Sequence, residues 1–316
     1  MSDTSRNSSS APVSLRIGSR GSQLALWQAN HIAAQLRAAG HTVSIEIIRT
    51  TGDALQNLSF SQVGSKGMFT KEIEEALFDG RIDLAVHSLK DLPTELAPPF
   101  ILAAIPPRAD ARDAFLSVHH RSFESLPSGA RVGTSSLRRQ AQLRRHRSDL
   151  DYIEFRGNID TRIRKLLEEQ ADAIILASAG LDRLGLTAYR RECFSPLILC
   201  PSAGQGALAI EARSGDASTL SALAFLDHAP TRYAVTAERA ALAALGGGCQ
   251  VPIGIHCFPA ERGYSITSAV AAPDGSQLLR IELENQVIEY PSELGRILAG
   301  RLLEQGARRL LEAAPS

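Results

Sequence analysis

Arginine side chains at the junctions between predicted loops and helices are the strongest chemical feature of this sequence. Guanidinium groups bind carboxylates through paired hydrogen bonds, and helix N-termini also favour anions. Arg138 and Arg139 directly follow a Gly-Thr-Ser-Ser segment at 133–136, so hydroxyl, amide and guanidinium groups can converge there. The pattern predicts a cleft for a ligand with several carboxylates, with a solvated helix face as the alternative. The junction arginines are Arg20, Arg138, Arg139, Arg156, Arg162 and Arg183.

A carboxylate and an imidazole follow one buried strand pattern. Residues 82–86 predict a buried strand that leads into His87, and Asp91 follows beside Lys90 and near Ser88. Ligands of open α/β sheets bind at the carboxyl ends of the strands. Asp91 therefore suits acid/base chemistry or the stabilisation of a cation, or else it caps a turn. His87 is either a base or a hydrogen-bonding residue of the strand.

A cysteine stands in a glycine run, Gly246 to Gly248, just after a long alanine-rich helical pattern. Glycine lets a backbone turn sharply and approach a bulky group closely. Cys249 is therefore either a chemical thiol or an incidental one, and no local Cys-His signature marks it as a nucleophile. The chain lacks a C-x-x-C pair, so no metal site is expected. The cysteines are Cys193, Cys200, Cys249 and Cys257.

Two further candidates lie on segments rich in glycine. Residues 51–67 have little periodicity and are long for a connection inside a domain, which predicts a lid. Phe69 follows this segment and is either an aromatic wall over a ligand or a core residue. Gln205, between two glycines, is either a ligand contact or part of a hinge between domains.

The composition describes an ordinary globular protein and limits its partners. The 316 residues are 44% hydrophobic and 22% charged, with a net charge of zero. A general nucleic-acid binder would be basic, and 5% aromatic residues are too few for base-stacking platforms. Residues 1–12 predict a disordered tail and not a secretory signal, and no segment predicts a membrane span. We expect a cytoplasmic protein with reduced thiols.

The alternation of strand and helix patterns predicts two α/β domains and a smaller third domain. A strand from Ser14, a helix over 23–38 and a strand near 43–48 open the first, and a similar alternation runs through residues 114–184. One long helix and three strand patterns follow residue 231. The predicted domains are 13–106 with 207–226 (α/β), 107–206 (α/β) and 227–316 (α+β, with Cys249).

Several motifs, in family order, resemble the porphobilinogen deaminase (hydroxymethylbilane synthase) family. The resemblance runs from about Val13 to Leu311. The motifs are Leu15 to Arg20, Leu24 to Gln28, Ala85 to Pro93, Val132 to Arg139, Arg156 to Asn158, Ala179 to Gly185, Gly204 to Ala207 and Gly248 to Gly254. One departure is Gln62, where many relatives have lysine, and it affects a lid contact only.

The resemblance implies a fold and a reaction. The two α/β domains would resemble the lobes of periplasmic ligand-binding proteins, with the active site between them. A dipyrromethane cofactor would be attached to Cys249 through a thioether. The enzyme would be a transferase of tetrapyrrole and heme biosynthesis. It would add porphobilinogen units to this primer, release ammonia at each step, and finally hydrolyse off the linear tetrapyrrole hydroxymethylbilane.

The resemblance also assigns roles to the candidate residues. Asp91 would stabilise the cation left by loss of ammonia and move protons, with Phe69 stacked near the ring. The cofactor would be bound by Cys249, Lys90, Ser88, Thr134, Ser136, Arg138, Arg139 and Ser22. The substrate would be bound by Arg20, Arg156, Arg162, Arg183, Phe69 and Gln205.

A monomer is expected from the family. The alternative function is a two-lobed protein that binds a polycarboxylate without catalysis. Such a protein predicts closure around its ligand but no release of ammonia, and it gives Cys249 no task.

Overall fold

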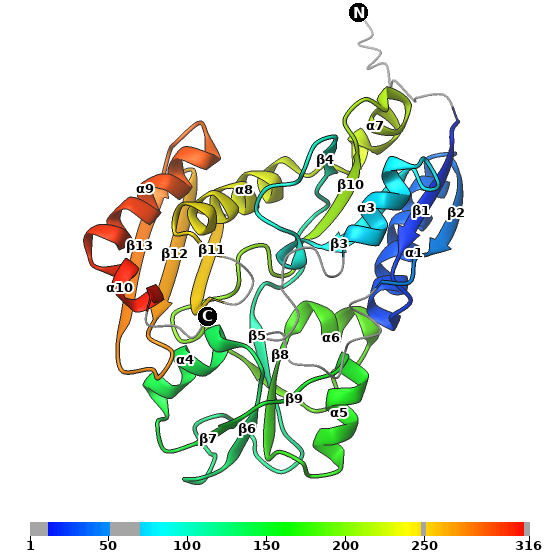
Figure 1. The fold of residues 1–316 in the computed structure, drawn as a ribbon. Coiled ribbons are helices and arrows are strands. Elements are labelled where there is room, and N and C mark those ends of the chain that lie inside the picture. The colour runs from blue at the N-terminus through cyan, green and yellow to red at the C-terminus, as the bar shows by residue number, and fades with distance from the viewer. Residues whose placement is uncertain (1–11, 51–69, 248–250, 313–316) are drawn as a thin grey trace, which may run out of the picture.

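The first sheet contains both the beginning of the chain and a strand that returns to it much later. The computed structural model describes residues 12–50, 70–247 and 251–312 (Figure 1). The strand order is β2-β1-β3-β10-β4, in which β1 is parallel to β2 and β3, and β10 is antiparallel to β3 and β4. The strands are β1 (Ser14–Ser19), β2 (Thr42–Ile47), β3 (Leu84–Ser88), β4 (Phe100–Ala104) and β10 (Leu208–Arg213).

Helices pack against this sheet through apolar faces at helical spacing. In α1 the buried residues Ala29, Ile32, Ala33 and Leu36 recur every three or four positions. The Ser22 hydroxyl accepts the Ala25 N–H at 3.3 Å and caps the helix. The helices of this part are α1 (Gln23–Ala38), α3 (Lys71–Phe78), η1 (Leu89–Asp91), α7 (Ala217–Leu223) and η2 (Ala224–Leu226).

The second sheet repeats the same plan. Its order is β7-β6-β8-β5-β9, with β6 parallel to β7 and β8, and β5 antiparallel to β8 and β9. Its strands are β5 (Asp113–Leu116), β6 (Arg131–Gly133), β7 (Asp151–Ile153), β8 (Ala173–Ala177) and β9 (Arg190–Cys193). Its helices are α4 (Leu137–His146), α5 (Ile159–Leu167) and α6 (Ser178–Leu184).

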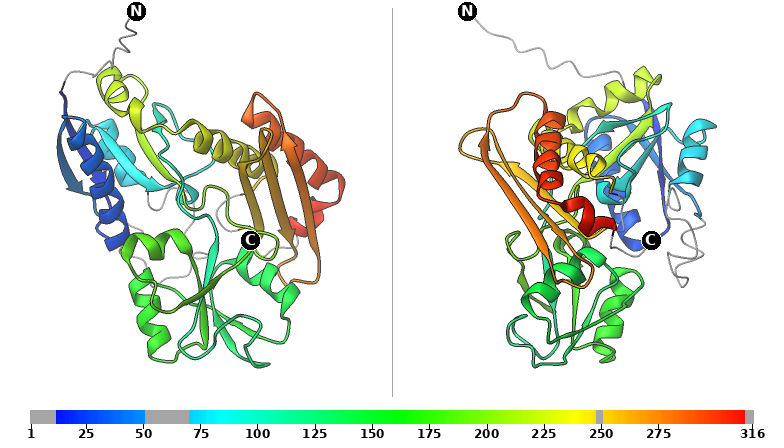
Figure 2. Two further views of the ribbon diagram at one scale, coloured as in Figure 1. Left: turned by 180° about the vertical axis from the view of Figure 1, so that it is seen from behind. Right: turned by 60° about the vertical axis from the view of Figure 1, so that its left-hand side comes forward.

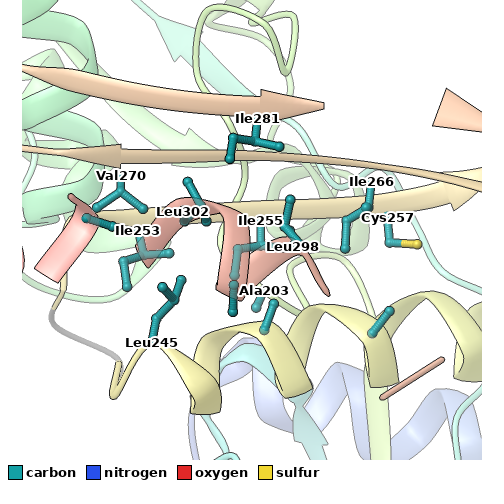
Figure 3. Close-up of a cluster of buried hydrophobic side chains, with 14 of the residues drawn as sticks. Ala203, Leu245, Ile253, Ile255, Cys257, Ile266, Val270, Ile281, Leu298 and Leu302 are labelled. Carbon is teal, nitrogen blue, oxygen red and sulfur yellow. The ribbon is translucent and has the colours of Figure 1, made fainter. Parts of the chain in front are cut away.

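The C-terminal part packs helices on one antiparallel sheet of order β11-β12-β13. Figure 3 shows Leu298 and Leu302 of α9 among the isoleucines of β11, with Ala203 at the same core. Ala203 belongs to the segment that leads into β10, so this core also anchors that segment. The elements are α8 (Ala229–Ala244), β11 (Ile253–Pro259), β12 (Tyr264–Ala271), β13 (Leu278–Gln286), α9 (Pro291–Glu304) and α10 (Ala307–Glu312).

Two segments of the chain cross between the first and second sheets (Figure 2). One joins β4 to β5 and the other joins β9 to β10. Arg108 of the first crossing donates to the Gln205 carbonyl of the second at 2.8 Å. Arg108 also pairs with Glu238 of α8 at 2.6 Å, and Glu238 accepts the Gly204 N–H at 2.7 Å. The Glu238 carboxylate thereby links both crossing segments to the C-terminal part.

The predicted α/β class with a smaller α+β part is confirmed, and the helix predicted over 23–38 has these bounds. The sequence patterns missed the strands β4 and β9, the helices α7 and α10, and the short helices η1 and η2. The strands β4 and β9 are short edge strands, which carry little periodicity. The predicted domain boundaries stay a prediction. The predicted lid, Phe69 and Cys249 lie outside the described residues.

Candidate active site

A pocket opens where β3 ends and α1 begins. Asp91 is exposed at this pocket, so its carboxylate is available to a ligand. Four predicted site residues from two separate segments meet there, because β1 and β3 are parallel neighbours whose carboxyl ends share one edge. Those four are Arg20, Ser22, Ser88 and Asp91.

Two hydrogen bonds fix the polar wall of the pocket. Ser22 is the N-cap of α1, which orients its hydroxyl at the helix start. Gln28, which is 2% exposed, donates from Nε2 to the Ser88 hydroxyl at 2.8 Å. Gln28 is not among the site residues predicted from the sequence. A polar residue on the apolar stripe with Ile32 and Leu36 was the available indication.

A second group of charges lies at the start of α4. Asp113 of β5 is completely buried and accepts from Arg138 Nη1 at 2.8 Å and from Arg139 Nη2 at 2.7 Å. Both guanidinium groups also donate to backbone carbonyls, those of Cys200 and Ile175. Burial alone would raise the pKa of Asp113, but the two arginines hold it well below its usual range.

Lys90 joins this cluster through Gln205. Lys90 Nζ lies 3.4 Å from Gln205 Oε1, and Gln205 Nε2 donates to Asp113 Oδ1 at 3.0 Å. Desolvation of the ammonium lowers the pKa of Lys90 to about 8, opposed by the charge of Asp91 beside it. We call Lys90, Asp113, Arg138, Arg139 and Gln205 the cation cluster.

Two glycines let the crossing segment approach β3 this closely. Gly204 has φ +73° and a Cβ there would lie 3.2 Å from the backbone nitrogen of Lys90. Gly206 has φ +85° and a Cβ there would lie 2.6 Å from the Ala109 carbonyl oxygen. Because a side chain would strain both positions, glycine on either side holds Gln205 against the cluster.

The hydroxyl residues before α4 shape its first turn. Ser136 accepts the Arg139 N–H at 3.5 Å as the helix cap, and the Thr134 hydroxyl accepts the Ser136 N–H at 3.3 Å. Thr134 is 1% exposed. Both residues therefore position the two arginines through the backbone.

The other junction arginines lie around the cluster with different partners. Arg162 donates to the Gly157 carbonyl at 2.7 Å, and burial followed by the charges of Arg139 and Arg156 lowers its pKa to about 10. Arg156 pairs with Glu154 at 2.5 Å. Arg183 donates to the Gly206 carbonyl at 2.8 Å, and burial lowers its pKa to about 10.

The charge balance of the cation cluster fits an anionic ligand. Its contacts join three side-chain cations, Lys90, Arg138 and Arg139, to the buried carboxylate of Asp113, and the charge of Asp91 acts on Lys90 as well. Buried positive charge that exceeds the nearby negative charge is unfavourable unless a bound anion neutralises it. A dipyrromethane carries acetate and propionate carboxylates, so the residues present fit this cofactor. Asp113 is not among the site residues predicted from the sequence, because a single acidic residue at the start of an apolar strand carries no distinctive pattern.

Fold and site together define an α/β protein of two mixed sheets whose junction gathers cations around one carboxylate. The chain matches the family model "Porphobilinogen deaminase, dipyromethane cofactor binding domain" over residues 15–221 and "Porphobilinogen deaminase, C-terminal domain" over 232–304. The chain belongs to the porphobilinogen deaminase family. It is a transferase of tetrapyrrole biosynthesis with a dipyrromethane cofactor.

Relatives match over nearly the whole chain. The porphobilinogen deaminase of Syntrophotalea carbinolica is 50% identical, covering 95% of both chains. That of Nitratidesulfovibrio vulgaris is 48% identical, covering 94% of this chain and 96% of its own. Among solved structures, the methionine-binding protein MetQ overlaps with a TM-score of 0.42 at 12% identity, over 66% of this chain and 89% of its own. Across the described ranges, no helix combines the length and apolar character that a membrane crossing needs.

Proposed function

We propose that this protein condenses porphobilinogen units onto its dipyrromethane primer and releases hydroxymethylbilane, with Asp91 as the catalytic carboxylate. The observation that carries the proposal is the exposed Asp91 carboxylate at the pocket, with the cation cluster directly beside it through Lys90. Loss of ammonia from the substrate's aminomethyl group leaves positive charge on the substrate. A carboxylate held at that place stabilises the charge and accepts the proton lost later.

The cations on both sides of Asp91 account for binding. The charge of Asp91 acts on Lys90 and also on Arg162, so it lies between groups of the first and second sheets. Bound dipyrromethane supplies the nucleophilic pyrrole carbon that starts the chain. The proposed cofactor-binding residues are Cys249, Lys90, Ser88, Thr134, Ser136, Arg138, Arg139 and Ser22. The proposed substrate-binding residues are Arg20, Arg156, Arg162, Arg183, Phe69 and Gln205.

The role of Asp91 is tested with Asp91→Asn in the cofactor-loaded enzyme. The amide keeps the shape but neither accepts a proton nor neutralises a cation, so porphobilinogen consumption should fall by about 100-fold or more. Cofactor content, read by the colour reaction of pyrroles with acid aldehyde reagent, should stay unchanged. The matched control is Glu95→Gln, an exposed carboxylate outside the pocket. Full turnover in Asp91→Asn removes this residue from the mechanism.

The attachment of the cofactor to Cys249 is tested by intact mass. Protein made in cells that supply porphobilinogen should be heavier than its sequence by one dipyrromethane. Cys249→Ser should lose this increment, and Cys193→Ser, which changes a half-buried free thiol, should keep it. Active protein of unmodified mass would exclude the covalent attachment.

We also propose a cytoplasmic monomer divided into 13–106 with 207–226, 107–206 and 227–316, preceded by a tail over 1–12. Each of the three sheets lies within one of these ranges, which supports the division. The free thiols of Cys193, Cys200 and Cys257 are consistent with a reducing compartment. Light scattering after size exclusion tests the monomer, limited proteolysis tests the division, and cell fractionation tests the compartment.

A further inference from the structure

Helix α6, which follows strand β8 of the second sheet, packs against helix α1, which follows strand β1 of the first sheet (Figure 1). A Cβ at Gly180 of α6 would lie 3.9 Å from Leu24 Cδ2 of α1, so the helices touch there. One turn further along each helix, Arg183 lies over the indole of Trp27, with its guanidinium carbon 5.9 Å from the ring centroid. Leu24 and Gln28 both line the pocket, so this contact adjoins the pocket wall.

The positive charge of Arg183 meets no carboxylate among the residues that the structure describes. Its contacts there are the Gly206 carbonyl, which accepts from Nη2 at 2.8 Å, and the Trp27 ring. The adjacent acid, Asp182, pairs with Arg190 instead, at 2.6 Å. Burial lowers the pKa of Arg183, as expected for a desolvated cation without an acidic partner. Such a guanidinium is stabilised when an anion binds to it.

The Trp27 ring is itself fixed by His31, one turn further along α1. The two ring centroids are 4.9 Å apart and the ring planes differ by 9°, so the rings are stacked. Burial and then the charge of Arg183 lower the pKa of His31, so its imidazole is neutral at pH 7 and adds no second cation. An indole face attracts a cation but carries no net charge. Trp27 can therefore orient the Arg183 guanidinium without neutralising it.

We propose that Trp27 is a positioning residue for substrate binding: stacked on His31, it holds the Arg183 guanidinium between α6 and α1, where a carboxylate of porphobilinogen completes the charge. The inference rests on the proposed function, which assigns substrate binding to Arg183. Trp27 touches no reacting atom in this role, so it should affect KM and leave kcat almost unchanged. Another aromatic ring at this position should preserve the role, and an aliphatic side chain should not.

Kinetics of cofactor-loaded variants test the positioning role. Trp27→Leu removes the aromatic face, so KM for porphobilinogen should rise about fivefold with kcat little changed. Trp27→Phe keeps a face and should recover most of this loss. Arg183→Gln removes the guanidinium itself and should raise KM by about tenfold or more. The double variant of Trp27→Leu with Arg183→Gln should match Arg183→Gln alone, because Trp27 acts through Arg183.

Two matched controls remove the same chemical groups elsewhere. Phe225→Leu removes an aromatic side chain that is 55% exposed in η2, and Arg164→Gln removes an arginine whose side chain is 63% exposed. Both should leave KM unchanged, because neither residue lines the pocket or contacts Arg183 in the described part of the chain. A fivefold rise of KM in either control would show that the assay reports general damage to the protein.

Fluorescence gives a readout that needs no turnover, because Trp27 is the single tryptophan of the chain. Iodide and caesium ions quench an indole from solution, and a cation beside the ring attracts iodide and repels caesium. Their quenching constants are each divided by that of neutral acrylamide, which corrects for exposure of the ring. The resulting iodide-to-caesium ratio of the holoenzyme should fall about threefold in Arg183→Gln and stay unchanged in Arg164→Gln.

Three outcomes overturn the proposal. One is an unchanged KM in Trp27→Leu although Arg183→Gln raises it. Another is a rise of KM by Trp27→Leu that is equally large in the Arg183→Gln background, because Trp27 would then act independently. The third is an iodide-to-caesium ratio that is the same with and without Arg183. Thermal melting and cofactor content identify a variant that has merely lost its fold, and the quenching of Arg183→Gln carries the test if Trp27→Leu does not fold.

Failure of the proposed function is distinguishable from these outcomes. An unchanged KM in Arg183→Gln would refute the substrate-binding assignment of Arg183, and with it the positioning role of Trp27, whatever the quenching ratio. Full turnover by Asp91→Asn would refute the catalytic assignment alone, because neither the KM comparison nor the quenching ratio depends on that carboxylate.

Discussion

Asp113 and Glu238 are both completely buried carboxylates with arginine partners, but their surroundings differ in charge balance. Glu238 pairs with Arg108 and accepts the backbone N–H groups of Gly204 and Cys257, each at 2.7 Å. One cation thus meets one anion, with His256 Nδ1 3.6 Å away. Asp113 instead meets two arginines and, through Gln205, a lysine.

This difference in charge balance distinguishes a structural ion pair, Glu238 with Arg108, from a site that can bind a ligand. A balanced, fully hydrogen-bonded pair has no capacity left for a further anion, so Glu238 fixes the two crossings to the C-terminal part. The cation cluster has positive charge in excess, so it gains from a bound polycarboxylate. Gln205 links the two centres, because its carbonyl accepts from Arg108 and its side chain donates to Asp113.

The largest effect on stability is expected when the charge-balanced Glu238–Arg108 ion pair is removed. Glu238→Gln leaves the largely covered Arg108 guanidinium, whose side chain is 11% exposed, without its carboxylate and should lower the free energy of unfolding by about 3–5 kcal/mol. Urea denaturation with and without bound cofactor should show the same loss, because no ligand replaces this anion. The matched control is Glu168→Gln, whose exposed pair with Arg164 should contribute less than about 0.5 kcal/mol. A loss of that size in Glu238→Gln would refute the structural role.

The corresponding change in the cation cluster should depend on the cofactor. Asp113→Asn leaves three cations together, so protein made without porphobilinogen should lose about 3 kcal/mol of stability. In the holoenzyme the cofactor carboxylates neutralise part of this charge, and the loss should be about 1 kcal/mol. Urea denaturation of both forms measures the difference. Equal losses of stability in the two forms would mean that the cofactor does not neutralise the cation cluster, and that the cluster is a structural ion pair like that of Glu238.

The sequence predicted some residues of the buried charge clusters but not their carboxylate partners. Arg138, Arg139 and Asp91 stand at strand ends and helix starts, where local patterns indicate ligand sites. Asp113 and Glu211 have no such mark, because each acquires its partner through strand pairing. Arg138 is 25 residues from Asp113, and Glu211 meets His87 only because β10 returns to the first sheet. Local periodicity finds the strand but not the strand's neighbour, so buried charge partners are found only in three dimensions.

The crossing between the two centres should tolerate no side chain at Gly206. Gly206→Ala places a methyl group 2.6 Å from the Ala109 carbonyl at a φ of +85°, which should cost about 1–3 kcal/mol. Gly215→Ala is the control, because no atom lies within 4 Å of a Cβ there and its φ is outside the left-handed region. Thermal denaturation compares the two. Similar melting temperatures for the two variants would show that the crossing segment can move away from the Ala109 carbonyl, so that Gly206 is not needed to hold Gln205 between Arg108 and Asp113.

The smallest expected effect is the pH dependence of the lysine in the cation cluster. With its pKa lowered to about 8, Lys90 loses its charge as pH rises from 7 to 9, so KM for porphobilinogen should rise by up to about tenfold. Lys90→Arg stays charged and should remove this alkaline rise. Between pH 8 and 10.5 the unfolded chain binds a proton here that the folded chain does not, so the contribution of Lys90 to stability increases with pH. An alkaline rise of KM that persists in Lys90→Arg would assign it to another group and leave the cluster with a fixed charge.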